Sequence, residues 1–202
     1  MKMLYAIPIL AGGLIAYSVL ASAKPPEEVP KFILKAYYAV SDSDKISMVP
    51  PVPPIGTEFT AEMYDGIRSS DDIWATPGTQ SSSQANLYKL TITKKELIGG
   101  FNWTFEGHVT GGAIFKHHVG GVWNFKNMGW NILFDRIAAG PPFEPEITDA
   151  VHSGSITDIA DYVNDNGVMY FVSYAYGILG LMRAQLFDDY VNFSIIPKEI
   201  NK

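Results

Sequence analysis

The sequence predicts a mainly β fold, namely a single antiparallel β-sandwich or barrel of about ten strands with one short helix, preceded by an N-terminal signal or anchor helix. Apolar and polar side chains alternate with period two along many short segments, which is typical of half-buried strands. Gly, Pro, Asn and Asp residues separate these segments and indicate turns. No repeat at a fixed period indicates a propeller or a solenoid.

Residues 1–23 have the layout of an export signal. Lys2 supplies a positive charge, residues 3–20 form an uncharged apolar run, and Ala-Ser-Ala ends the segment as a cleavage site. The run is longer than the roughly 7 to 15 residues of a typical signal core and approaches the roughly 17 that span a bilayer, so an uncleaved anchor is the alternative. In either case Lys2 favours the cytoplasmic side, and the remainder is expected to be extracytoplasmic.

The composition narrows the classes of function. The formal charge is −6, and removing residues 1–23, whose only charged side chain is Lys2, would leave −7. An acidic chain with 15 Lys plus Arg is a poor partner for phosphate backbones, so nucleic-acid binding is not expected. The absence of cysteine excludes thiolate catalysis, disulfides and cysteine-ligated metal centres.

The rest of the chain divides into a linker and one domain. Residues 24–30 contain three prolines and favour extended backbone, and residues 31–202 are expected to form a single β-rich extracytoplasmic domain. The β-forming side chains of residues 31–40 predict the first strand. The four prolines of residues 48–55 exclude a central strand there, and the alternation in residues 57–64 predicts a second strand.

A polar stretch at residues 69–86 has no sustained periodicity and predicts a long loop. Trp74 is the one large aromatic residue in this stretch. It is either a contact residue for a partner or a cap that folds back on the core.

The centre of the chain, residues 97–135, predicts an antiparallel meander that follows a strand at residues 87–93. A three-residue loop at 110–112 keeps the apolar side chains of the strand before it and of the strand after it on the same face of the sheet. A similar loop at 120–122 leads to the next strand of the meander. Residues 127–129 form the next turn. This register places Glu106 opposite Lys116 and His118 opposite Asn124, and it points His117 inward.

The C-terminal part predicts one helix followed by strands. Residues 147–164 have a helical pattern, with Ser155 as the N-cap and Asp158 as its capping-box partner. The uncharged, Tyr-rich run at residues 168–182 predicts a buried strand. Residues 181–196 read as a final hairpin that turns at Asp188-Asp189.

In the predicted register, Glu106, His108 and His118 share the polar face of neighbouring strands. Imidazole and carboxylate groups at this spacing are suitable ligands for zinc or copper. Lys116 between them opposes a cation, so a solvated face with a Glu106–Lys116 pair is the alternative. These three residues are the metal candidates, and no other cofactor is predicted.

The sequence favours a protein without catalytic activity. Asp149, His152 and Ser153 or Ser155 are the residue types of a nucleophilic triad, but they crowd into one short segment. Triads are assembled from separate strand ends and loops, and no G-x-S-x-G elbow is present. The Gly-Gly pairs lie between strands and do not precede helices, so they do not predict a phosphate-binding loop.

Two further groups of residues are candidates for modification or binding. Asn102 and Asn192 begin N-x-Ser/Thr sequons on faces predicted to be polar, and they support export. A set of aromatic side chains could line a barrel that holds a small apolar ligand, or could simply fill the core. This set comprises Trp103, Phe105, Phe115, Trp123, Phe125 and Trp130.

The leading functional hypothesis is an exported or membrane-anchored β domain with a non-catalytic binding or structural role in the cell envelope or an extracellular assembly. Its expected partners are envelope proteins and, if the leader is uncleaved, the membrane through residues 3–20. One alternative is a carrier of a small apolar ligand. A second is a metal-dependent enzyme that uses Glu106, His108 and His118.

Overall fold

The computed structural model describes residues 29–41, 52–53, 56–71, 74–76, 81–139, 150–178 and 183–199. The predicted signal or anchor, residues 1–23, lies outside these ranges, as do residues 24–28 of the linker. Across the described ranges, no helix has the length and apolar character needed to cross a membrane.

The described chain contains nine strands, close to the predicted number, and they form two antiparallel sheets. The strands are β1 (Lys31–Ser41), β2 (Thr57–Glu58), β3 (Ser83–Thr93), β4 (Ile98–Thr110), β5 (Phe115–Asn124), β6 (Gly129–Ala139), β7 (Ala150–Ile156), β8 (Val168–Ile178) and β9 (Gln185–Pro197). A short helix, α2 (Ala61–Asp65), and a single 3-10 turn, η1 (Lys95–Leu97), complete the set.

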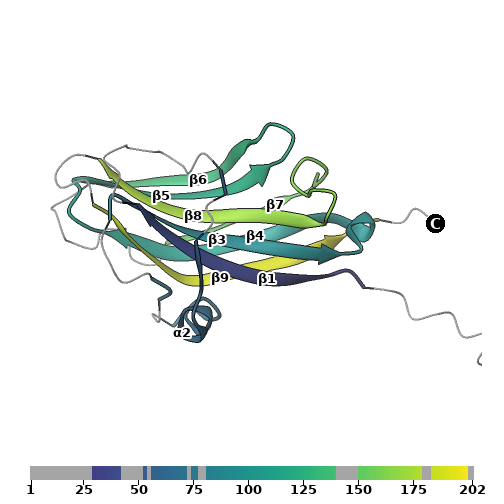
Figure 1. Cartoon of the computed structure of the whole chain (residues 1–202), viewed down its shortest axis with the longest axis horizontal. Coiled ribbons are helices and arrows are strands. Elements are labelled where there is room, and N and C mark those ends of the chain that lie inside the picture. The colour runs from purple at the N-terminus through teal and green to yellow at the C-terminus, as the bar shows by residue number, and fades with distance from the viewer. Residues whose placement is uncertain are drawn as a thin grey trace, which may run out of the picture.

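The two sheets lie face to face in a sandwich-like arrangement (Figure 1). Sheet A has six strands in the order β2-β1-β3-β8-β5-β6, and sheet B has three in the order β7-β4-β9. Both sheets are open within the described residues. The mainly β prediction is therefore confirmed, whereas its closed-barrel alternative is wrong.

Aromatic side chains from both sheets fill the space between them. The buried ring of Phe105 on β4 lies 5.7 Å from Tyr88, 5.9 Å from Phe134 and 5.8 Å from Phe193, measured between ring centroids. Phe171 on β8 adds a further contact to Phe105 at 6.5 Å. These contacts join β3, β6 and β8 of sheet A to β4 and β9 of sheet B, so the core is shared by both sheets.

Several of the strands predicted from the sequence are confirmed in sheet A. The strand predicted at residues 31–40 is β1, and the one predicted at residues 87–93 is the second half of β3. The turn predicted at residues 127–129 overlaps the observed turn at residues 125–128, which joins β5 to β6 and brings Trp123 opposite Trp130. The buried strand predicted at residues 168–182 is β8, which ends at Ile178.

The strand predicted at residues 57–64 is wrong beyond its first two residues. Only Thr57–Glu58 pairs with β1, and Ala61–Asp65 forms α2. The Oγ1 atom of Thr60 accepts a hydrogen bond from the backbone N–H of Met63 at 3.3 Å, which caps the helix. The alternation that predicted a strand therefore reflects one helical turn that buries Met63 against the core.

The helix predicted at residues 147–164 is also wrong. Residues 150–156 form β7, which pairs antiparallel with β4. Ser155 lies opposite Asn102 in this ladder and is not an N-cap. Pairing with β4 supplies the backbone hydrogen bonds that the helix would have made, and the Ser and Gly residues of β7 are weak helix formers.

The predicted final hairpin is wrong as well, because β9 continues from Gln185 to Pro197 without a turn. The register between β4 and β9 shifts where Glu106 pairs with Tyr190 and Gly107 pairs with Asp188. Asp189 is therefore the extra residue of a β-bulge.

The predicted register of the central meander is wrong, because consecutive strands β4 and β5 belong to different sheets. Gly111, at φ 141°, lies in the connection between the two sheets. Residues 120–122 are not a loop but part of β5, and the bulge beside them is on β6, where Leu133 is the extra residue between the partners of Gly120 and Gly121. A Cβ at Gly120 would overlap the ring of Phe134, so the packing of this ring requires glycine.

The three side-chain placements drawn from that register change accordingly. Glu106 lies opposite Val151 and Tyr190, and His118 lies opposite Arg136 and Ala175. His117 is buried as predicted, but its ring stacks on Tyr176 at 4.3 Å, away from the core between the sheets.

Candidate functional site

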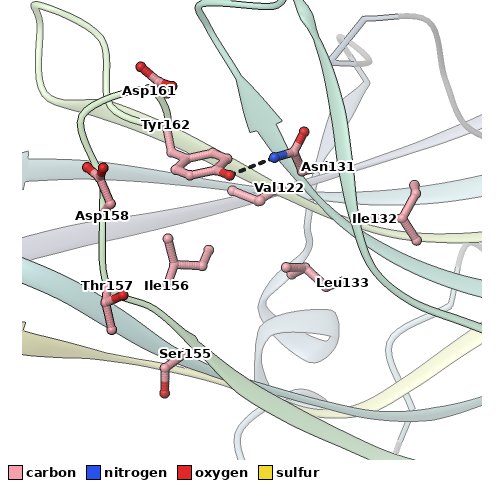
Figure 2. A pocket seen from close by; sticks show the side chains of 10 residues that line it. All are labelled: Val122, Asn131, Ile132, Leu133, Ser155, Ile156, Thr157, Asp158, Asp161 and Tyr162. Atoms are coloured by element: carbon pink, nitrogen blue, oxygen red, sulfur yellow. Dashed lines mark hydrogen bonds between the residues drawn. The ribbon is translucent and has the colours of Figure 1, made fainter.

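An open cleft of about 420 Å³ lies between the edges of the two sheets (Figure 2). One wall comes from β5 and β6 of sheet A, and the other comes from the end of β7 and the turn that follows it. Apolar side chains meet polar ones in this cleft. The lining residues are Val122, Asn131, Ile132, Leu133, Ser155, Ile156, Thr157, Asp158, Asp161 and Tyr162.

The polar residues of the cleft already have partners within the chain. Asn131 donates a hydrogen bond from Nδ2 to the Tyr162 hydroxyl at 2.6 Å, and the Lys126 ammonium lies 3.4 Å from Oδ2 of Asp161. Oδ1 of Asp158 accepts from the backbone N–H of Ala160 at 3.2 Å, and the rest of this side chain is exposed. The cleft therefore presents an apolar surface beside fixed amide, hydroxyl and carboxylate groups, which suits a polar or cationic ligand with an apolar body.

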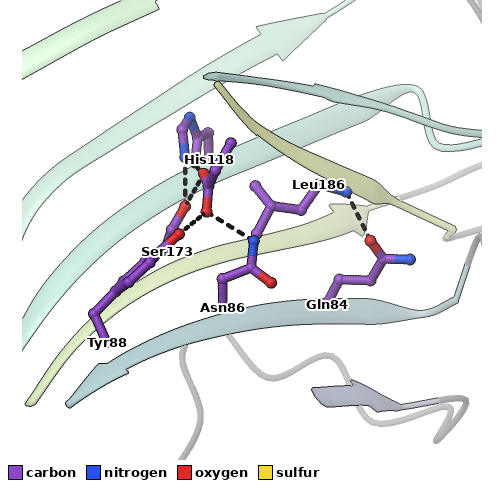
Figure 3. A network of polar contacts seen from close by, with 7 residues as sticks. Gln84, Asn86, Tyr88, His118, Ser173 and Leu186 are labelled. Atoms are coloured by element: carbon purple, nitrogen blue, oxygen red, sulfur yellow. Dashed lines mark hydrogen bonds and ion pairs between the residues drawn. The ribbon is translucent and has the colours of Figure 1, made fainter. Parts of the chain in front are cut away.

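A second polar cluster is buried between the sheets around Asp188 (Figure 3). Oδ2 of Asp188 accepts from the Tyr88 hydroxyl at 2.6 Å and from Nδ2 of Asn86 at 2.8 Å, and Oδ1 accepts from the Ser173 hydroxyl at 2.7 Å. Burial raises the pKa of Asp188 and outweighs these hydrogen bonds, which lower it. Burial, together with the Asp188 charge, also raises the pKa of Tyr88, so its hydroxyl remains a donor.

The same hydrogen bonds determine the tautomer of His118. Because Ser173 donates its proton to Asp188, its oxygen accepts from Nε2 of His118, which is 2.9 Å away. The proton of the neutral ring is then on Nε2, and Nδ1 has no hydrogen-bond partner among the described residues. Burial is the main cause that lowers the pKa of His118 to about 3, with smaller contributions from His152, His108 and Arg136.

Serine, histidine and aspartate therefore meet in this cluster, but in the wrong order for nucleophilic catalysis. In a catalytic triad the histidine lies between the other two and takes the proton of the serine. Here Ser173 lies between His118 and Asp188, and Asp188 takes its hydrogen bond. Nε2 of His118 is 3.8 Å from Oδ1 of Asp188, and with a neutral ring this contact is not an ion pair. The cluster is best described as a buried structural network.

A neutral His118 predicts that the protein loses stability in acid. The unfolded chain takes up a proton near pH 6.5, whereas the folded state resists protonation until about pH 3. The contribution to the free energy of unfolding is complete above pH 6.5 and falls, by on the order of 4 kcal/mol, as the pH approaches 3. Urea unfolding between pH 7 and pH 4 measures this loss.

His118→Gln is the control for this prediction, since the amide can still donate to Ser173 but does not titrate. Asp188, whose pKa shift acts in the opposite direction, is present in both proteins. The wild type should therefore lose stability more steeply than the variant below pH 6.5. Equal slopes for the two proteins would contradict a buried neutral His118.

The structure does not bring the predicted metal ligands together. The Glu106 carboxylate accepts a hydrogen bond from Ser70 at 3.0 Å, and the ring of His108 stacks on Phe187 at 4.6 Å. His118 belongs to the other sheet and faces the core. No group of three His, Cys, Asp or Glu residues in the described ranges has the geometry of a metal site. The shared polar face depended on pairing β4 with β5, and that pairing is absent.

The predicted ligand-lining aromatic residues do not share one face. Trp103 and Phe105 belong to the core between the sheets, whereas Trp123 packs against Trp130 at 5.3 Å and Trp130 contacts a separate apolar cluster. Phe115 is 37% exposed. Phe125, which is half-buried, lies 6.1 Å from Tyr170. The set is divided because Trp123 points to the opposite face of sheet A from its neighbour Val122, which belongs to the core between the sheets.

The two sequons lie opposite each other on one face of sheet B. Asn102 pairs with Ser194, and Thr104 pairs with Asn192. Both asparagine side chains are exposed. The amide of Asn102 accepts from Ser155 at 2.8 Å and donates to Ser194 at 3.3 Å. Trp74, the other exposed candidate, is 40% exposed and packs edge-on against His108 at 4.9 Å.

The buried network was not predicted from the sequence. The sequence predicts a turn at Asp188, and neither Asn86 nor Ser173 belongs to a motif that indicates a buried polar site. The available signal was that an Asp-Asp pair interrupts an alternating run from residue 185 to residue 197. An acid inside such a run indicates either a turn or a bulge with an inward carboxylate, and only the pairing with β4 distinguishes the two.

The fold and the cleft define a mainly β protein of two antiparallel sheets with an open groove along one pair of sheet edges. No protein-family model matches the chain, and a search of curated proteins finds no match.

Proposed function

We propose that this protein is an exported or membrane-anchored β domain with a non-catalytic binding or structural role in the cell envelope or an extracellular assembly. The observation that carries the binding role is the cleft between β6 and β7, where an apolar surface and fixed polar groups are open to solvent. The export layout of residues 1–23 supports the location.

The chemistry of the two polar sites favours binding over catalysis. His118 and Asp188 are each 0% exposed, so a substrate cannot reach the cluster that contains serine, histidine and aspartate. Of the two carboxylates in the cleft, Asp161 pairs with Lys126 and Asp158 is exposed. In the described structure, neither forms a hydrogen bond with a histidine or a serine that could act in catalysis. Fixed polar groups beside an apolar wall are the usual features of a recognition site.

The location is tested by fractionating cells that make the native protein. We expect either a mature chain that begins at Lys24 outside the cytoplasm or a full-length chain in the membrane fraction. Finding the full-length chain in the soluble cytosol would overturn the location.

The binding role is tested with a photo-crosslinking amino acid placed at Ile132 in the cleft. Ile132 is 48% exposed, so the side chain can reach a partner. The control position is Ile33 on β1, which is 64% exposed and does not line the cleft. We expect a discrete crosslinked product in cells from position 132 and none from position 33. No product from position 132 would count against the binding role.

Export also leads to a prediction about N-glycosylation. When the protein passes through a eukaryotic secretory pathway, we expect a higher glycan occupancy at Asn192 than at Asn102. Asn192 lies on the outermost strand of sheet B, whereas the amide of Asn102 bridges Ser155 and Ser194 across the central strand. Mass spectrometry of glycopeptides from the wild type, Asn192→Gln and Asn102→Gln measures the two occupancies. Unmodified asparagine at both positions would contradict the prediction.

No specific observation favours the two alternative functions. The aromatic residues predicted to line a ligand cavity are divided between separate clusters, and the predicted metal ligands contact different neighbours. Carrier and metal-enzyme functions therefore remain predictions from the sequence.

A further inference from the structure

Sheet edges expose backbone N–H and C=O groups that can pair with another chain, and proteins usually protect them. Three of the four edges described here are protected. On sheet A, β2 covers only Tyr37 and Tyr38 of β1, and the part of β1 before them carries the exposed charges Lys31 and Lys35. At the other edge, β6 carries the exposed charges Asp135 and Arg136. On sheet B, β9 is bridged by Arg68 and Ala75 from the segment after α2.

The fourth edge, β7, lacks such protection. Its seven residues contain no Asp, Glu, Lys, Arg or Pro, and in the described chain it pairs only with β4. Val151 on this strand is 59% exposed. An uncharged edge strand of this length is a suitable template for a further strand.

The cleft lies beside the C-terminal end of β7. The ring of His152 on β7 stacks on Phe134 of β6 at 4.0 Å, so these two edge strands lie opposite each other. Ile132 and Leu133 of β6 line one side of the cleft, and Ile156 of β7 lines the other (Figure 2). A strand added to β7 would cover these apolar side chains.

The charges at one end of the cleft indicate which partner would fit. Asp158 and Asp161 both line it, and only Asp161 has a cation, Lys126, within ion-pair distance in the described structure. An incoming segment with a basic residue at this end would supply the complementary charge. The chain itself is acidic, at −6, which argues against a second copy as the occupant.

We propose that β7 accepts an added β-strand from a partner protein, an extended segment of about seven residues that matches the length of β7. Alternate apolar side chains of the segment enter the cleft against Ile132 and Leu133, and a Lys or Arg lies beside Asp158. Backbone pairing with β7 provides the binding, and the cleft selects the alternating pattern. This inference rests on the proposed binding function and specifies the kind of partner.

The test uses the full chain and a phage-displayed library of random nine-residue peptides. We expect enriched peptides that alternate apolar and polar residues and contain a basic residue. Hydrogen exchange of the complex should show new amide protection in β7. No enrichment, or protection confined to strands other than β7, would overturn the proposal.

Charge reversal at the cleft supplies a matched pair of variants. Asp158→Lys should weaken the binding of an enriched peptide at least tenfold by fluorescence anisotropy. Asp165→Lys is the control, because Asp165 lies in the same connection between β7 and β8 but does not line the cleft and is fully exposed. Equal loss in both variants would overturn the proposed docking site. Concentration-dependent dimerisation through β7, measured by sedimentation, would also overturn it by making a second copy the occupant.

The two proposals fail in different ways. If position 132 crosslinks a partner in cells but β7 gains no amide protection with any peptide, the binding role stands and strand addition fails. If position 132 yields no product, the binding role itself fails, whatever the peptides do.

Discussion

Asp188→Ala is expected to lower the free energy of unfolding by about 3 to 5 kcal/mol. The substitution leaves Tyr88, Asn86 and Ser173 as buried donors that have lost their acceptor. Each unpaired donor costs about 1 to 3 kcal/mol, and the release of a buried charge offsets part of the sum. Urea denaturation of the purified protein at pH 7 measures the difference.

Two controls make the Asp188 result specific. Asp188→Asn keeps the shape and one acceptor oxygen and should lose less stability than the alanine variant. Asp165→Ala removes an exposed carboxylate and should leave the free energy of unfolding almost unchanged. If both alanine variants are equally stable, the network around Asp188 does not contribute in the way its hydrogen bonds indicate.

Phe105→Ala should cost about 3 to 5 kcal/mol of stability, as truncations of fully buried aromatic residues do. Phe105 is 0% exposed and contacts rings on both sheets, including Tyr88, Phe134 and Phe193. Rings that are themselves packed cannot collapse into the space that is left, so a cavity remains. The midpoint and slope of urea unfolding measure the loss.

Phe115→Ala is the matched control for Phe105, because it removes the same side chain from a position that is 37% exposed. It should cost less than about 1.5 kcal/mol. A cost for Phe115 equal to that for Phe105 would mean that the centre of the core does not lie between the two sheets at Phe105.

Local patterns in the sequence are sufficient to locate several individual strands. Alternation and β-forming side chains locate β1 and β8, and the Asn-Met-Gly turn locates the hairpin between β5 and β6. These features depend on residues that are close along the chain. A period of two and a turn residue are therefore visible without knowledge of the partner strand.

The same local patterns fail where a long-range contact decides the structure. Residues 150–156 have a spacing that also fits a helix, and pairing with β4 makes them a strand. Gly120-Gly121 has the composition of a hairpin loop, and pairing on both sides of β5 makes it part of a continuous strand. In each case the competing structures differ little in intrinsic propensity, so tertiary pairing determines the outcome.

The predictions from the sequence differ most from the structure at the candidate sites. The asparagines of both sequons are exposed as predicted, but the histidines predicted as metal ligands are on different sheets. The cleft depends on β6 and β7 being edges of separate sheets, and no residue spacing reveals a sheet edge.

The sequence alone is sufficient to identify this chain as an acidic, mainly β protein and to locate most of its strands approximately. The export signal or anchor at residues 1–23 stays a prediction. The assignment of β4 and β5 to different sheets depends on the tertiary structure, as does the inward placement of Asp188. Strand formation follows from the local alternation of apolar and polar side chains. The choice of partner strand depends on contacts between residues far apart in the chain, such as Trp103 of β4 with Phe193 of β9.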